Sequence, residues 1–302
     1  MQHGRASVPR VRAVLGRHPI GYLFVAPFVA FFALVFAYPL GFAVYMSVHD
    51  YFFAAPGAHV DRPFVGLENY RQLLHDPELH AALGHIAQFL LINVPISVVT
   101  ALLVATALNT VRWRLVFGTA FYVPYVTSAI AVVAAWIVLL SGDGLVSALL
   151  GPAAPTPSWL VNQTWALPVI ALVVSWKWLG FYILVYLAAL QAVPNELYDA
   201  AAIDGSGAVR RFWHVTVPGV RGATVIVLVI SIINSANLFN EPFLLTGGGG
   251  PNGATTTPVL LMYQQGIEQG HVGYAAAIGV ALTLLVVAVS AMSGGLIERR
   301  DR

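Results

Sequence analysis

Polar side chains that could bind a hydroxyl-rich solute recur within one apolar stretch of this sequence. Most of them are three or four residues apart, so a single helix would place them on one face. They are Ser231, Asn234, Asn237 and Glu241, with Asn240 beside them. Their amides and carboxylate could bind solute hydroxyl groups in a membrane cavity. Hydrogen bonds between neighbouring helices explain them equally well, and the sequence leaves both interpretations open.

Lys177 is the only lysine of the chain and lies inside another apolar stretch, between Trp176 and Trp178. A charge at the centre of a membrane helix costs about 2.5–3.5 kcal/mol on insertion scales, so the ammonium group must face protein or water. Glu241 is the one carboxylate well within an apolar stretch, which suggests a Lys177–Glu241 ion pair. Two alternatives remain. Lys177 could lie in a solute path beside indole rings that stack on a sugar, or it could only contact helix-end carbonyl groups.

Other kinds of site are disfavoured by residue type and spacing. The chain has no cysteine, which excludes disulfides and thiolate ligands. The nine histidines show no His-x-x-x-His spacing near a carboxylate, so we expect no metal site. The glycines at Gly247–Gly250 are not followed by Lys-Ser or Lys-Thr, so they do not form a phosphate-binding loop. No Ser-His-Asp arrangement stands out, and we expect no catalytic residues.

The composition indicates helices surrounded by membrane lipid. Of the 302 residues, 58% are hydrophobic and 9% are charged, with a mean hydropathy of +0.78, whereas soluble domains have about 25% charged residues. The net charge of +2 gives no sign of nucleic-acid binding. Six apolar runs reach the roughly 20 residues that a bilayer requires. They predict an all-α integral membrane domain over 21–297, with spans at 21–48, 83–108, 115–140, 166–190, 223–245 and 274–297.

The positive charges predict how this domain is oriented. Of the fifteen Lys and Arg residues, only Arg62 and Arg71 fall on one side of the predicted spans, and nearly all the others fall on the opposite side. Cytoplasmic loops carry the excess of positive charge. We therefore expect a cytoplasmic loop at 191–221 and cytoplasmic termini, formed by a basic tail at 1–20 and a short tail at 298–302.

The expected cytoplasmic loop contains a charge-rich segment that predicts a helix, a turn and a second helix. Asn195 would cap the first helix. Gly205 would end it, because glycine tolerates the left-handed conformation of a helix stop, and would also let the two helices meet closely. The second helix would run from about Ala208 until Pro218 ends it.

The same segment carries a pattern of fixed spacing. Asp199-Ala200-Ala201 is followed after three residues by Gly205, and after nine more by Val215-Thr216-Val217-Pro218. This resembles the EAA motif of ABC importer permeases, which reads Glu-Ala-Ala, three residues, Gly, nine residues and Ile-any-Leu-Pro. The chain departs from the motif at Asp199, Val215 and Val217, and each departure keeps the charge or the apolar character. Nearly the whole chain is similar to carbohydrate permeases of the maltose and glycerol-phosphate transporter group, through weaker matches at 23–27, 38–40, 64–70, 122–125, 187–191 and 245–251.

The resemblance implies the type I ABC importer permease fold in a bacterial plasma membrane, with a sugar-like solute. It implies a second permease subunit, usually in a heterodimer, two cytoplasmic ATP-binding subunits and an extracytoplasmic solute-binding protein. ATP and magnesium would bind to the partners and not to this chain. We expect a flexible contact of Gly247–Gly250 with the solute-binding protein. The residues expected to couple to the ATPase are Glu196, Asp199, Ala200, Ala201, Asp204, Gly205, Arg210, Val215 and Pro218.

Two other classes of protein would leave the motif unexplained. A self-sufficient secondary transporter normally has several ionisable groups within the membrane, and here only Lys177 and Glu241 qualify. It also often shows an internal repeat, which is not evident in this sequence. A membrane-embedded enzyme would need a convergent set of acids, histidines or metal ligands, which the sequence does not offer.

Overall fold

The computed structural model describes residues 19–54 and 60–298, and most of this length is helical. The one isolated β-bridge in the described part pairs His49 with Phe64. The all-α fold expected from the sequence is confirmed. Of the predicted tails at 1–20 and 298–302, the structure describes only residues 19, 20 and 298, which belong to the ends of the first and last helices. The rest of both tails lies outside the described residues.

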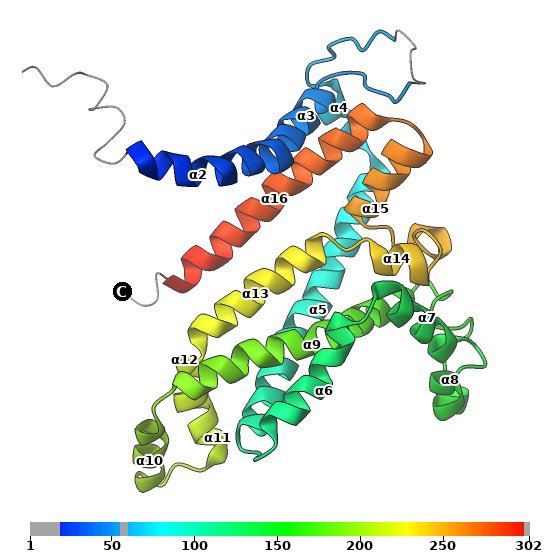
Figure 1. Cartoon of the computed structure of the whole chain (residues 1–302). Coiled ribbons are helices and arrows are strands. Elements are labelled where there is room, and N and C mark those ends of the chain that lie inside the picture. Colours follow the sequence, from blue (N-terminus) through cyan, green and yellow to red (C-terminus); the bar gives the residue numbers. More distant parts are fainter. Residues whose placement is uncertain (1–18, 55–59, 299–302) are drawn as a thin grey trace, which may run out of the picture.

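The described part of the chain begins with a helical arm that stands apart from most other helices (Figure 1). The arm comprises α2 (Pro19–Phe32), the π-helical turn η1 (Ala33–Ala37) and α3 (Tyr38–Ser47). Its second half, α3, packs on the last helix, α16 (Val272–Glu298). In the most apolar window of this arm, 0% of the residues are buried. The described part of the chain therefore leaves the most apolar stretch of the arm uncovered.

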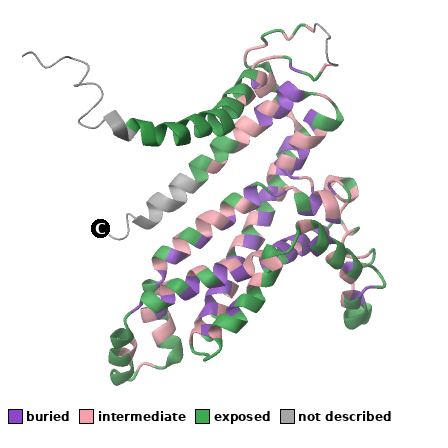
Figure 2. Ribbon diagram, viewed as in Figure 1, coloured by how far each residue is buried: buried purple, intermediate pink, exposed green. Residues whose placement is uncertain are grey.

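Four helices form the centre of the molecule, where buried residues concentrate (Figure 2). Two long ones pack along each other, and two shorter ones cover them. They are α5 (Pro77–Asn109), α9 (Ala166–Ala192), α6 (Arg114–Val126) and α13 (Arg221–Ala236). Glycine permits the closest approach, since a Cβ at Gly180 of α9 would lie 2.0 Å from the carbonyl oxygen of Phe121 in α6.

Short helices lie toward the two sides of this centre (Figure 1). One side carries α10 (Asn195–Ile203), α11 (Ala208–Arg211), η3 (Phe212–Thr216) and α12 (Val217–Gly219). The opposite side carries α4 (Glu68–His75), α8 (Leu145–Leu150), η2 (Gly151–Ala153), α14 (Asn240–Leu245), η4 (Pro251–Gly253), α15 (Pro258–Tyr263) and η5 (Gln264–Glu268).

The predicted span 115–140 is wrong as a single helix. α6 ends at Val126, the next two residues take extended backbone, and α7 (Ala129–Leu140) then begins. Pro124 lies inside α6, which continues for two residues beyond it, so the break lies at Thr127 and Ser128. The run that is long and apolar enough to cross a membrane is instead Ala129–Ala153.

The predicted span 223–245 is also wrong as a single helix. α13 ends at Ala236 and α14 begins at Asn240, with three non-helical residues between them. Pro242 explains the break, because in a continuous helix its ring would clash with the carbonyl group of Leu238. That carbonyl instead accepts a hydrogen bond of 2.6 Å from the Thr257 hydroxyl. The polar stripe expected on one helix is therefore divided between two.

The described chain has enough apolar helix for a polytopic membrane protein. Five helical runs are long and apolar enough to cross a membrane. A sixth candidate is a helix pair, Ala208–Gly219 and Arg221–Ala236, which is bent by 71°. The second predicted loop helix thus ends one residue after Pro218, at the bend into α13.

Candidate functional site: a broken span and an exposed helical loop

The expected ion pair is present at the break between α13 and α14. Lys177 Nζ of α9 lies 3.3 Å from Glu241 Oε1 of α14, and the two side chains are 13% and 10% exposed. Glu241 lies in the first turn of α14, where the positive end of the helix stabilises a carboxylate. The hypothesis of a Lys177–Glu241 contact is confirmed, and the pair fixes α14 against α9.

Two exposed amide side chains flank the break between α13 and α14. Asn237 directly follows α13 as its C-cap and Asn240 begins α14, and both are exposed. The Asn237 amide donates to the carbonyl of Ile233 at 2.8 Å, which leaves its oxygen available to accept. Trp176 is 42% exposed, and its ring meets that of Trp136 edge to face at 5.5 Å. The exposed amides at the break can both donate and accept, which suits a solute with many hydroxyl groups.

Ser231 and Asn234, the other members of the predicted stripe, lie in the helix interface. Ser231 is 0% exposed, and Asn234 is half-buried. The Ser231 hydroxyl and the Asn234 amide nitrogen are buried without a well-formed hydrogen bond among the described residues, and both side chains interact with the Tyr182 hydroxyl of α9. For these two residues the packing interpretation is favoured over direct contact with a solute.

A buried hydrogen-bond network that the sequence analysis missed joins three central helices. Asn93 of α5 donates to Ser175 of α9 at 2.8 Å and to the carbonyl of Ala171 at 3.2 Å. Ser235 of α13 donates to the Asn93 side-chain oxygen at 3.1 Å. The available signal was Asn93 itself, an amide in an apolar span, but its partners depend on how the helices are rotated.

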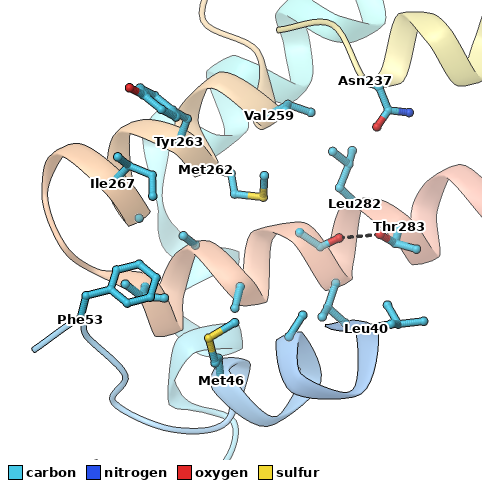
Figure 3. A pocket seen from close by; sticks show the side chains of 17 residues that line it. Leu40, Met46, Phe53, Asn237, Val259, Met262, Tyr263, Ile267, Leu282 and Thr283 are labelled. Carbon is cyan, nitrogen blue, oxygen red and sulfur yellow. Dashed lines mark hydrogen bonds between the residues drawn. The ribbon is translucent and has the colours of Figure 1, made fainter. Parts of the chain in front are cut away.

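A cavity of about 470 Å³ lies among α3, α15, η5 and α16 (Figure 3). Its lining is mostly aliphatic and includes Leu40, Met46 and Val259. Asn237 is the one residue of the predicted solute path that borders it. This lining offers few groups to bind solute hydroxyls, so the cavity itself is a poor match for a sugar.

The glycines at 247–250 form a turn that hydrogen bonds hold. Gly248 N donates to the carbonyl of Phe243 at 3.0 Å, and the Gly248 carbonyl accepts from Gln264 at 3.0 Å. The hydroxyl oxygens of Thr246 and Thr255 lie 2.7 Å apart across the turn. All four glycines have positive φ, between +66° and +117°. Gly249 is buried and only Gly247 is exposed, so most of the turn faces inward.

Gly205 ends α10 in the way that the sequence predicts. Its φ is +72°, its N–H donates to the carbonyl of Ala202 at 3.0 Å, and Ser206 N donates to that of Ala201 at 2.9 Å. These two bonds form a Schellman motif, which satisfies carbonyl groups at the helix end. A Cβ at Gly205 would meet nothing within 4 Å, so close helix approach is not the reason for glycine here. The predicted cap is also wrong, since Asn195 is the first helical residue and Pro194 precedes it as the cap.

The loop helices have one face directed to the core and one exposed face. Tyr198, Phe212, Val215 and Val217 pack on the central core, and Tyr198 Oη lies 3.2 Å from Thr216 Oγ1. The exposed face combines large apolar residues, between 51% and 87% exposed, with charged ones. The apolar residues are Leu197, Ile203, Val209 and Trp213. The charged ones are Glu196, Asp199, Asp204 and Arg210, and the predicted residues Ala200, Gly205 and Pro218 are exposed with them, whereas Ala201 is half-buried.

The described part of the chain is thus mainly helical, with an interrupted span and an exposed helical loop between two spans. The family model described as the binding-protein-dependent transport system inner membrane component matches residues 89–302. The chain belongs to this family, and it is a multi-pass protein of the bacterial plasma membrane.

Curated relatives match over most of their length. The arabinooligosaccharides transport system permease protein AraP of Bacillus subtilis is 36% identical over 90% of this chain and 86% of its own. The lactose transport system permease protein LacF of Rhizobium radiobacter is 31% identical, over 89% of this chain and 91% of its own. The sn-glycerol-3-phosphate transport system permease protein UgpA of Yersinia enterocolitica is 31% identical, over 93% and 95%.

A solved structure confirms the fold. In the crystal structure of a bacterial ABC transporter involved in the import of the acidic polysaccharide alginate, one chain superposes with a TM-score of 0.79 at 20% identity. The match covers 96% of this chain and 99% of that one. The fold is therefore that of an ABC importer permease.

Proposed function

We propose that this chain is a permease subunit of an ABC importer that moves a sugar or sugar-like solute into the cytoplasm. It would hydrolyse nothing itself, because ATP and Mg²⁺ would bind to two partner ATPase subunits. The termini and α10–α12 would lie on the cytoplasmic side. A second permease subunit, usually different from this one, would complete the path. The observation that carries the proposal is the loop with the EAA-type pattern, whose helix has a defined stop and an exposed apolar face.

The exposed face of α10–α11 has the character of a surface that binds a groove on another protein. Large apolar residues such as Ile203, which is 87% exposed, are unfavourable in water and favourable in a hydrophobic groove. Asp199 and Glu196 would meet donors on the rim of that groove. Since α10 directly follows α9 and α12 leads into α13, closure of the ATPase pair would move both spans as one body.

The proposed solute path passes the break in the fifth span. Asn237 and Asn240 would bind hydroxyl groups, and Trp176 would stack on a sugar ring. The names of the relatives include arabinooligosaccharides, lactose and sn-glycerol-3-phosphate, which supports a sugar-like solute but leaves its charge open. The solute-binding protein would deliver it to the side of the turn at 247–250, with contact through Gly247 and its neighbours.

The test uses a pair of glycine substitutions in the loop. A Cβ would meet nothing within 4 Å at either Gly205 or Gly207, but Gly205 has a φ of +72° and Gly207 a φ of −68°. Gly205→Ala therefore strains the helix stop by about 1–2 kcal/mol, whereas Gly207→Ala does not. We expect Gly205→Ala to lower solute-stimulated ATP hydrolysis roughly fivefold or more, while Gly207→Ala leaves it unchanged.

The measurement requires the chain purified with the ATPase, second permease and solute-binding protein encoded beside it, in lipid nanodiscs. Co-purification with the ATPase and the difference between the two variants would support the coupling role. If the chain instead purifies without an ATPase and transports solute into liposomes without ATP, it is a secondary transporter and the proposal is wrong.

A further inference from the structure

The interior of the described spans contains one positive and one negative side chain. Apart from Lys177 and Glu241, the charged residues of the described helices lie near helix ends or in the short helices at the two sides of the bundle. The two charges lie 3.3 Å apart and are almost buried, so each neutralises the other. The break in the fifth span therefore has no net charge.

The polar and aromatic groups that adjoin the pair in the chain are also uncharged. Asn237 and Asn240 are exposed amides, each of which can donate and accept. The partly exposed indole of Trp176 adjoins Lys177 in the chain. None of these groups would compensate the charge of a phosphate, sulfonate or carboxylate on a bound solute.

We propose that the Lys177–Glu241 pair makes this site select an uncharged, hydroxyl-rich solute over an anionic sugar. This inference rests on the proposed function, because it assigns the solute class of the same path. It concerns the membrane subunit alone and is independent of what the solute-binding protein prefers.

Electrostatics in a poorly solvated site explains the selection. A single ammonium group in such a site would attract an anion strongly, because little water screens the interaction. Here an anionic solute would have to displace Glu241, which the chain holds beside Lys177 at a high effective concentration. The Glu241 carboxylate would also repel the solute's negative charge. A neutral sugar avoids both costs and leaves the ion pair intact.

The test compares a neutral and an anionic sugar in a setting without the solute-binding protein. The permease–ATPase assembly in nanodiscs is titrated with lactose and with a disaccharide uronate of the same size, and the ratio of the two dissociation constants is measured. We expect the wild type to prefer lactose. Glu241→Gln leaves Lys177 unpaired and should shift the ratio about tenfold toward the uronate, as expected for one added charge-assisted hydrogen bond.

Two further variants keep the test decisive. Lys177→Met/Glu241→Gln removes both charges and, with them, both costs of binding an anion. It should therefore shift the ratio toward the uronate, by less than Glu241→Gln does because no unpaired ammonium group remains, and this comparison with the wild type stands even if Glu241→Gln alone does not fold. Glu268→Gln removes an exposed carboxylate of η5, away from the ion pair, and should keep the wild-type ratio.

The possible failures have different meanings. A wild type that prefers the uronate, a well-folded Glu241→Gln with an unchanged ratio, or a double variant that selectively loses uronate binding would overturn the inference while the importer function stands. If neither sugar binds and no sugar stimulates ATP-driven uptake by the complete transporter, the proposed function fails, and the inference fails with it.

Discussion

The central helices and the N-terminal arm are both apolar, yet they are packed in opposite ways. In the most apolar window of α9, 56% of the residues are buried within the chain, against 0% in the arm. The centre has small and polar residues at its contacts, such as Gly180 and Asn93. The arm instead presents large side chains outward, such as Phe24, which is 80% exposed. In a membrane protein, then, hydropathy identifies the spans, whereas small and polar residues identify the spans that pack within the chain.

The largest difference between the two regions is expected in the free energy of unfolding, when one phenylalanine in each region is replaced by alanine. Phe89 is 0% exposed in α5 and Phe24 is 80% exposed in α2. Phe89→Ala should lower the free energy of unfolding by about 3–5 kcal/mol, because it opens a cavity in the core. Phe24→Ala should change it by less than about 0.5 kcal/mol. Denaturant titration in detergent micelles measures both values.

The same pair also tests whether the arm has a protein partner. If a second permease subunit covers the arm, Phe24→Ala should reduce co-purification with that subunit although the isolated chain stays stable. Equal losses of stability in the two variants would show that the arm packs within the chain after all.

A smaller difference in lost stability is expected between alanine substitutions at two glycines, one in each region. A Cβ at Gly180 would lie 2.0 Å from a backbone oxygen of α6, whereas at Gly41 in α3 it would meet nothing within 4 Å. Gly180→Ala should therefore cost about 2–3 kcal/mol, because α6 must move away. Gly41→Ala should be neutral or slightly stabilising, since alanine is the better helix former. The midpoint of thermal unfolding distinguishes the two, and a neutral Gly180→Ala would contradict the close α6–α9 contact.

The smallest difference in lost stability is expected within the centre itself, between alanine substitutions at two polar residues of α5. Asn93 makes three hydrogen bonds to α9 and α13, so Asn93→Ala should cost about 1–2 kcal/mol. Ser97 is 1% exposed, and its hydroxyl has no partner among the described residues. Ser97→Ala should therefore cost nothing measurable, because no described hydrogen bond is lost. An equal loss for both, measured by denaturant titration, would mean that Ser97 has a partner that the chain itself does not supply.

The sequence was sufficient where a local rule decides the outcome. The turn at Gly205 follows from the backbone freedom of glycine, and the Lys177–Glu241 contact follows from the cost of an isolated charge in a span. Both features are present, at a φ of +72° and a distance of 3.3 Å.

The sequence was insufficient where a distant residue decides the outcome. Pro27 and Pro95 lie inside helices that continue through them, so a proline alone does not predict a break. The fifth span does break at Pro242, where the Leu238 carbonyl finds the hydroxyl of Thr257, a residue that caps the distant helix α15. No local pattern announces that contact. The same holds for Asn93, whose partners lie on two other helices.

The glycine turn has a consequence for the gene. At Gly249 a Cβ would lie 2.5 Å from the Thr256 hydroxyl oxygen, and at Gly250 it would lie 2.8 Å from that of Thr255, with positive φ at both. Any amino acid that a single base change can put in place of glycine carries a Cβ. Asparagine, which tolerates positive φ best among the others and has it at position 252 in this turn, is not within reach of a single base change from a glycine codon. Silent changes of the third base are therefore the variation that these codons can accumulate without harm.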